Sequence, residues 1–133
     1  MNFISDTMKL NERDAVSYLT YNRLSEIDFI RHAFSTRLGG VSSGIYESMN
    51  LSFEHDAFDT VTENYKRFCN AAGFDFDTLV ASSQDHHTFV RVCTKEQCGI
   101  GISRPKDIQS VDALVTNELG VTLVTYYADC TPL

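Results

Sequence analysis

The end of the chain constrains the fold most strongly. Two apolar runs, residues 113–116 and 121–127, lie on either side of the turn-forming segment 117–120. Both runs are rich in β-branched and aromatic residues and are too short for a typical helix, so they predict either a β-hairpin or two neighbouring core strands. The second run leads directly to Asp129 and Cys130. Side chains at a strand end are held by the sheet yet face its open rim, which suits residues that do chemistry.

The size of the chain predicts one domain. At 133 residues it is long enough to bury a real core, roughly 68% of its unfolded surface. The chain stops three residues after Cys130, directly behind a strand that is expected to be buried. We therefore expect residues 1–133 to form a single domain that is incomplete at its C-terminal end.

Composition excludes several classes of protein. Hydrophobic residues make up 43% of the chain and charged residues 22%, which is typical of a globular protein rather than a disordered one. The net charge of −7 argues against a nucleic acid or an anionic membrane as partner, because clustered Lys and Arg drive phosphate binding. No apolar run approaches the roughly 18 residues of a membrane span.

The four cysteines occur without a signal peptide, so we expect reduced thiols and a cytoplasmic location. Cys93 and Cys98 have no second pair beside them, and the spacing favours a strand residue and a loop residue over a structural zinc site.

Further elements precede this end of the chain. Extended, apolar runs predict strands at residues 15–21, 29–36, 79–83 and 88–93. The residues before position 15 form a polar lead-in. The clearest helix covers residues 56–73, where Asp59 is placed to cap the start and Gly73 to end the last turn. Its predicted buried face consists of Val61, Tyr65, Phe68 and Ala72.

A glycine-rich loop follows the second of these strands, at residues 37–51. Gly39 and Gly40 allow a backbone that points several N–H groups at an anion, and the planar guanidinium of Arg37 fits phosphate or carboxylate. The spacing matches neither a P-loop nor a dinucleotide fingerprint, so a plain turn is the alternative.

Two histidines, His86 and His87, lie between predicted strands, as Cys130 lies at the end of one. An imidazole beside a thiol can take its proton and so make a nucleophile, or both groups can ligate zinc. Spacing alone does not separate such a joint site from chance placement of His and Cys at strand ends.

Several motifs in the same order resemble one known family. They are the runs FSTRLGGVSSGIYESMNL at residues 34–51, VTEN at 61–64, LVASSQDH at 79–86, VDALVT at 111–116 and ADC at 128–130. Together they resemble the N-terminal part of the YfiH family, which is also labelled multicopper polyphenol oxidase or laccase-like, peptidoglycan editing factor and purine nucleoside phosphorylase.

The resemblance implies a site. The histidine of the family's Gln-x-His-Gly motif corresponds to His86, and the cysteine of its Ala-Asp-Cys motif to Cys130. A second histidine, in a later His-Ala-Gly-Trp-Arg-Gly motif, has no counterpart, and the sequence contains no Trp. His87 stands where the family usually has Gly, and Tyr65 where an Arg commonly follows Glu-Asn.

The implied fold is α+β, with two mixed β-sheets packed together and helices outside, in α/β/β/α layers. The implied chemistry is phosphorolysis of adenosine, inosine or methylthioadenosine, together with adenosine deamination. Zinc, held by His86 and Cys130, is the expected metal, with copper as the alternative. Arg37, Gly39 and Gly40 are the candidates for binding phosphate, and Asn50 for binding the nucleoside, although Asn50 equally suits a turn.

Two other functions stay open. One is a copper-dependent phenol oxidase, although blue-copper chemistry needs two histidines with one cysteine. The other is an inactive fragment. We expect the full-length protein to be a monomer, and this chain by itself to self-associate and to lack catalysis. We also predict that His86 and Cys130 approach each other closely enough to share a metal or a hydrogen bond.

Overall fold

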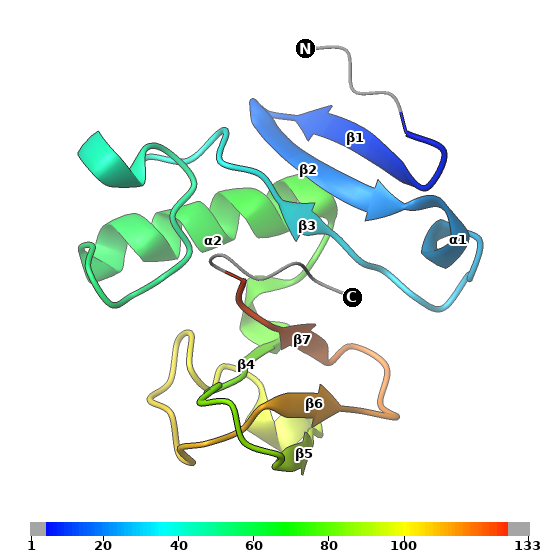
Figure 1. The fold of residues 1–133 in the computed structure, drawn as a ribbon, viewed down its shortest axis with the longest axis vertical. Coiled ribbons are helices and arrows are strands. Elements are labelled where there is room, and N and C mark those ends of the chain that lie inside the picture. Colours follow the sequence, from blue (N-terminus) through cyan, green and yellow to red (C-terminus); the bar gives the residue numbers. More distant parts are fainter. Residues whose placement is uncertain (1–4, 128–133) are drawn as a thin grey trace. The chain divides into compact units, whose positions relative to one another are not determined.

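A computed structural model describes residues 5–127 of the chain. The chain divides into two compact units, Met1–Phe74 and Asp75–Leu133 (Figure 1). The prediction of a single, incomplete domain stays a prediction.

The first unit begins with a β-hairpin. Strands β1 (Met8–Arg13) and β2 (Val16–Tyr21) pair antiparallel, and β3 (Phe34–Ser35) adds to the other side of β2. Asp14 and Ala15 between the first two strands have φ of 52° and 66°, as a two-residue turn with the twist of the strands requires.

Two expectations for this sheet need correction. Strand β2 was predicted. The polar lead-in before it was not predicted as a strand, but it forms the edge strand β1, which is held by backbone hydrogen bonds to β2 rather than by an apolar pattern. The predicted strand 29–36 shortens to Phe34–Ser35, because only those two residues pair with β2. A one-turn helix, α1 (Asn22–Ser25), follows β2.

The predicted helix is α2 (Phe58–Ala72). Its start differs from expectation: Ala57 is the N-cap residue, and Asp59 lies in the first turn, where its negative charge suits the helix dipole, instead of capping it. Gly73 ends the helix as predicted, with φ of 78° and its N–H bonded 2.8 Å from the Cys69 carbonyl oxygen.

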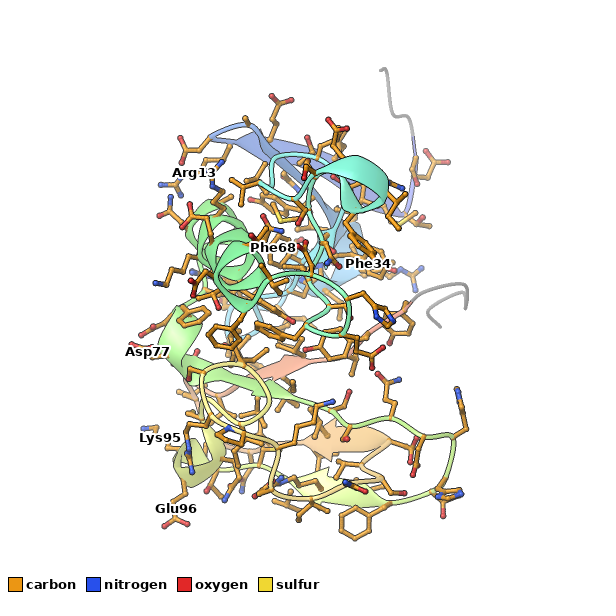
Figure 2. The ribbon with its side chains drawn as sticks, turned by 90° about the vertical axis from the view of Figure 1, so that its left-hand side faces the viewer. Arg13, Phe34, Phe68, Asp77, Lys95 and Glu96 are labelled. Carbon is orange, nitrogen blue, oxygen red and sulfur yellow. The ribbon has the colours of Figure 1, made fainter. Side chains whose placement is uncertain are left out.

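Helix α2 packs on the β1–β2–β3 sheet. The core of this contact contains Val16, Met49 and Ala71. Tyr18 meets the ring of Phe68 edge-on at 6.3 Å between centroids, and its hydroxyl donates to the Ala71 carbonyl at 3.3 Å. Phe68 lies on the side of the helix that faces the strands (Figure 2).

The second unit contains two parallel strand pairs. Strand β4 (Leu79–Ala81) pairs with β7 (Thr122–Val124), and β5 (Val90–Val92) pairs with β6 (Ala113–Val115). Of the two alternatives predicted for the last two apolar runs, the hairpin is therefore wrong, since β6 and β7 each hydrogen-bond to an earlier strand instead of to each other.

Short 3-10 turns complete the described chain: η1 (Gly44–Tyr46), η2 (Phe76–Thr78) and η3 (Lys95–Gln97). Residues Lys95 and Glu96 of η3 are exposed and point outward (Figure 2). An antiparallel sheet, parallel pairs and a long helix confirm the α+β class. Within residues 5–127, no helix is long and apolar enough to cross a membrane.

Candidate functional site

His86 lies in the loop that joins β4 to β5. Both ends of this loop are tied to the segment before β6, because Ser83 and Val111 exchange backbone hydrogen bonds of 3.1 and 2.9 Å, and the Phe89 carbonyl accepts from Asp112 N–H at 3.1 Å. The loop therefore closes on itself. His86 is exposed at its tip, with φ of 68°, a left-handed conformation that few residues with a side chain adopt.

The carboxylate of Asp112 lies inside this loop. Its Oδ1 accepts the backbone N–H groups of Asp85 at 3.0 Å and His86 at 2.7 Å. Burial by itself raises the pKa of Asp112, but the N–H groups of Asp85, His86 and His87 outweigh it and hold that pKa below its ordinary value. No role was predicted for Asp112 from the sequence, in which a charged residue directly before an apolar strand is the only signal.

The two adjacent histidines differ in their surroundings. His87 Nδ1 lies 3.0 Å from Ser110 Oγ, which donates to Asp85 Oδ1 at 2.7 Å. The imidazole of His86 forms no hydrogen bond or ion pair with any residue between 5 and 127. The ring of His87 is thus tied to its own loop, whereas that of His86 is available.

The β4–β7 pair brings two distant segments to one edge. Since the strands are parallel, the chain leaves both at the same end, with Ala81 opposite Val124. Beyond that point, Gln84 Oε1 accepts the Tyr126 N–H at 3.0 Å. Gln84 precedes His86 by two positions, and Tyr126 precedes Cys130 by four. Cys130 lies outside the described residues, so its predicted approach to His86 stays a prediction.

The described residues do not form a metal site by themselves. Among residues 5–127, no group of three or more His, Cys, Asp or Glu side chains could hold a metal ion. An imidazole nitrogen from His86 and a thiolate from Cys130 suit zinc chemically, but a catalytic zinc keeps three protein ligands. These two donors alone fall short of that set.

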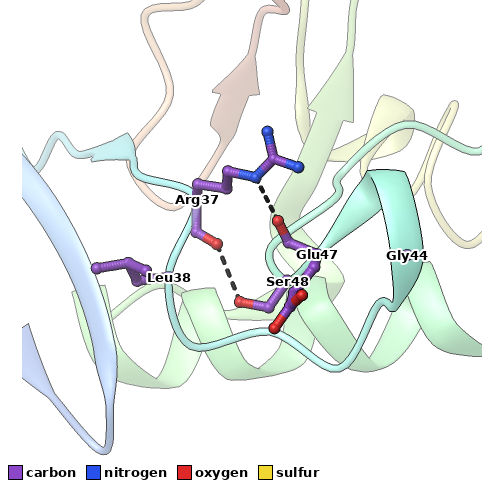
Figure 3. A pocket seen from close by; sticks show the side chains of 5 residues that line it. All are labelled: Arg37, Leu38, Gly44, Glu47 and Ser48. Atoms are coloured by element: carbon purple, nitrogen blue, oxygen red, sulfur yellow. Dashed lines mark hydrogen bonds between the residues drawn. The ribbon is translucent and has the colours of Figure 1, made fainter.

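Arg37 lies in the first unit, where it lines a pocket of about 290 Å³ together with Leu38, Gly44, Glu47 and Ser48 (Figure 3). Two nitrogen atoms of its guanidinium already form hydrogen bonds within the loop. Nε donates to the Glu47 carbonyl, and Nη2 donates to the Ile45 carbonyl at 2.7 Å. These bonds fix the plane of the guanidinium, and Nη1 forms no hydrogen bond with the described residues.

Gly39 and Gly40 lie where another segment of the backbone passes close to their own. A Cβ at Gly39 would lie 2.4 Å from the Ala15 carbonyl oxygen, and one at Gly40 would lie 2.0 Å from that of Ser48. Neither glycine is among the residues that line the pocket. Their geometry explains why glycine stands there, and their binding of phosphate stays a prediction.

Asn64 holds this loop from helix α2. It is completely buried, its Oδ1 accepts the Val41 N–H at 2.7 Å, and its Nδ2 donates to Ser42 Oγ at 2.9 Å and the Asn50 carbonyl at 2.8 Å. This role of Asn64 was not predicted from the sequence. The signal was present, since Asn64 is a polar residue three positions after Val61 on the apolar face of the helix.

Asn50, the candidate for nucleoside binding, forms a turn in this structure. Its Oδ1 accepts the Ser52 N–H at 3.0 Å, and its Nδ2 lies 3.3 Å from Asp56 Oδ2. Asp56 also accepts from Ser42 Oγ at 2.7 Å. Hydrogen bonds from Ser42, from the Ala57 backbone and from Asn50 lower the pKa of Asp56. A contact of Asn50 with nucleoside stays a prediction.

Comparison with known proteins gives consistent relatives. A purine nucleoside phosphorylase of Mus musculus is 37% identical over 110 residues, covering 80% of this chain and 23% of its own length. A purine nucleoside phosphorylase of Deinococcus radiodurans is 38% identical over 104 residues, covering 78% of this chain and 37% of its own length. This chain thus spans less than half of either relative.

Solved structures share the fold. The crystal structure of YlmD from Geobacillus stearothermophilus matches with a TM-score of 0.74 and 24% identity, over 95% of this chain and 46% of that one. The structure of the Bacillus licheniformis hypothetical protein YfiH matches with a TM-score of 0.75 and 21% identity, over 91% and 45%. The family described as multi-copper polyphenol oxidoreductase laccase matches residues 31–133. The chain belongs to this family, the YfiH family.

Proposed function

We propose that the whole protein is a purine nucleoside phosphorylase. The observation that carries the proposal is the shared edge of β4 and β7, where the His86 loop starts beside the segment that leads to Cys130. The names of the relatives from Mus musculus and Deinococcus radiodurans support the same activity.

The reaction needs one bond to form and one to break. An oxygen of inorganic phosphate bonds to C1′ of the ribose, the bond from C1′ to the base nitrogen breaks, and the base leaves with the electron pair and takes up a proton. We assign the handling of that proton to His86, because an imidazole can act as a general acid or base.

We assign the binding of inorganic phosphate to Arg37. Two of its nitrogen atoms already bind the loop's carbonyls, so the guanidinium is held in place before any ligand arrives. Its Nη1 remains to donate to a phosphate oxygen. Gly39, Gly40 and Asn50 complete the proposed substrate contacts, with adenosine, inosine and methylthioadenosine as substrates and adenosine deamination as a second activity.

Zinc belongs to the proposal as the cofactor, with His86 and Cys130 among its ligands. Since two donors are fewer than a catalytic zinc keeps, further ligands would have to come from outside the residues named here. A cytoplasmic location is also part of the proposal, because it would keep the thiols of the chain reduced.

The test uses the full-length protein with inosine or adenosine and phosphate, and chromatography that detects the free base and ribose 1-phosphate. We expect His86→Ala and Cys130→Ala to abolish product formation and Arg37→Ala to raise the KM for phosphate. His87→Ala is the matched control and should keep most activity. Ribose 1-phosphate formed at the parent rate by His86→Ala and Cys130→Ala would refute the proposed site.

Two further arms separate the alternatives. Adenosine without phosphate tests deamination, with inosine as the product. A phenol with copper-loaded protein tests the oxidase that the family description names. Phenol turnover that needs copper, in a protein that releases no ribose 1-phosphate, would replace the phosphorylase by an oxidase.

A further inference from the structure

The loop that carries His86 is built around an anion that the chain itself supplies. The successive backbone N–H groups of Asp85 and His86 both point at Asp112 Oδ1, at 3.0 and 2.7 Å. Consecutive N–H groups that converge in this way form a concave site for an anion, which is often a bound phosphate. Here the carboxylate of Asp112 occupies that concavity.

The conformation of this loop needs such a partner. His86 has φ of 68°, a left-handed conformation that is unfavourable for a residue with a side chain and persists where its surroundings hold it. The backbone bonds of Ser83 and Phe89 fix the two ends of the loop, and the bond from the His86 N–H to Asp112 fixes its tip.

Backbone conformation sets the direction of the Cα–Cβ bond of His86, from which the imidazole extends. The ring forms no hydrogen bond with residues 5–127, so no hydrogen bond within that part of the chain orients it. We infer that Asp112 is the positioning residue for His86, which sets the direction of the imidazole through the backbone of the loop. The inference rests on the proposed function, in which His86 acts on the substrate.

A neighbouring cluster provides the matched control. Ser110 Oγ contacts Asp85 Oδ1 at 2.7 Å and His87 Nδ1 at 3.0 Å, so it links the same two segments without touching the His86 N–H. Ser110→Ala therefore removes another link between the same two segments and leaves the Asp112 carboxylate and the N–H groups of Asp85 and His86 intact.

The experiment compares Asp112→Ala, Asp112→Asn and Ser110→Ala in the full-length protein. For Asp112→Ala we expect kcat to fall about tenfold to a hundredfold, as displaced catalytic groups do, with the KM for inosine and phosphate within about twofold. Asp112→Asn keeps an acceptor oxygen, so its kcat should fall less than that of Asp112→Ala. The kcat of Ser110→Ala should stay near that of the parent.

Amide hydrogen exchange gives a second reading that does not depend on catalysis. In Asp112→Ala, the amides of Asp85 and His86 should exchange faster, whereas those of strand β4 should stay protected. If Asp112→Ala unfolds as a whole, the same comparison is made with Asp112→Asn, which keeps the shape of the side chain.

The outcomes separate the inference from the proposed function. Parent kcat and unchanged exchange in Asp112→Ala, with His86→Ala inactive, would overturn the inference and leave the proposed function standing. Full activity in His86→Ala would instead refute the proposed role of His86 in the reaction, and hydrogen exchange would still decide whether Asp112 holds the loop. An equal loss of kcat in Ser110→Ala would also overturn the inference, because any damage to the loop would then have the same effect.

Discussion

Polar side chains hold the backbone of both loops that carry predicted site residues. Asn64 reaches from helix α2 to bond the loop that follows Arg37, and it uses its carbonyl oxygen and its amide nitrogen. Asp112 and Gln84 act in the same way in the second unit. A buried polar group that lost such partners would cost about 1–3 kcal/mol, so Asn64, which is completely buried, ties its loop to one conformation.

The first prediction concerns Gly40. In Gly40→Ala the new Cβ would lie 2.0 Å from the backbone carbonyl oxygen of Ser48, so the loop has to move. We expect a loss of several kcal/mol in the free energy of unfolding, of the order known for severe strain and overpacking. Urea unfolding of the full-length protein, followed by circular dichroism, measures it.

Gly44 supplies the matched control. It lies in the same loop with φ of 64°, but nothing lies within 4 Å of a Cβ built there. Gly44→Ala should cost only about 1–2 kcal/mol, the price of a left-handed conformation. Equal losses for the two variants would mean that the close backbone approach at Gly40 is not what requires glycine.

Single residues differ in how far the sequence predicted them. Gly73 was predicted as the end of α2, because a glycine after a helical pattern is a local signal. Asp112 was not assigned a role, because its partner His86 lies 26 positions away and only the fold brings them together. Asp59 was wrongly predicted as a cap, since the helix starts one residue before it.

At the scale of elements, local sequence patterns predicted where the helix and several strands lie, but not which strands pair with each other. Helix α2 follows from its own apolar face, and strands β2, β4 and β5 from their own residues. The pairing of β7 with β4 joins Thr122 to Leu79 across more than 40 positions. No local periodicity encodes such a parallel pairing, which is why an adjacent hairpin was an open reading of the sequence.

The second prediction concerns the link between strand β5 and the loop before β6. Arg91 and Asp107 form two parallel hydrogen bonds of 2.6 and 2.7 Å. The hydrogen bond from Arg91 lowers the pKa of Asp107 from 3.8 to about 2. Because the folded pKa is depressed, this pair stabilises the fold above the unfolded pKa, and the contribution is lost as the pH falls from 3.8 towards 2.

Asp107→Asn tests this link. Urea unfolding of parent and variant should differ most at about pH 6 and converge as the pH approaches about 2. The side chain of Asp107 is 45% exposed, so solvent screens the pair and the difference should be small. A difference that stays constant over this pH range would show that the Asp107 carboxylate does not contribute through its charge.

At the scale of the whole molecule, the order of motifs predicted more than any element did. Five runs in family order predicted the family, which the match over residues 31–133 confirms, and the α+β class, which the solved structures confirm. Composition and periodicity gave neither, because they describe elements one at a time. The approach of His86 to Cys130 depends on residues beyond Tyr127, so the sequence and the shared edge of β4 and β7 support it as a prediction.

The last prediction concerns the 133-residue chain by itself, which should not catalyse phosphorolysis. It spans 37% of the Deinococcus radiodurans relative, and its predicted metal ligands, His86 and Cys130, are fewer than the three of a catalytic zinc.

Self-association is expected for the same chain. Strands β5 and β6 leave apolar side chains exposed, with Val90 at 51%, Val92 at 65% and Val115 at 44%. Such surface favours contact between copies. Size-exclusion chromatography of the purified chain should show concentration-dependent dimers, and calorimetry should show weaker zinc binding than in the full-length protein. Ribose 1-phosphate formed by this chain at the full-length rate, and lost in Cys130→Ala, would contradict the prediction, because a second copy or another residue would then have to complete the site.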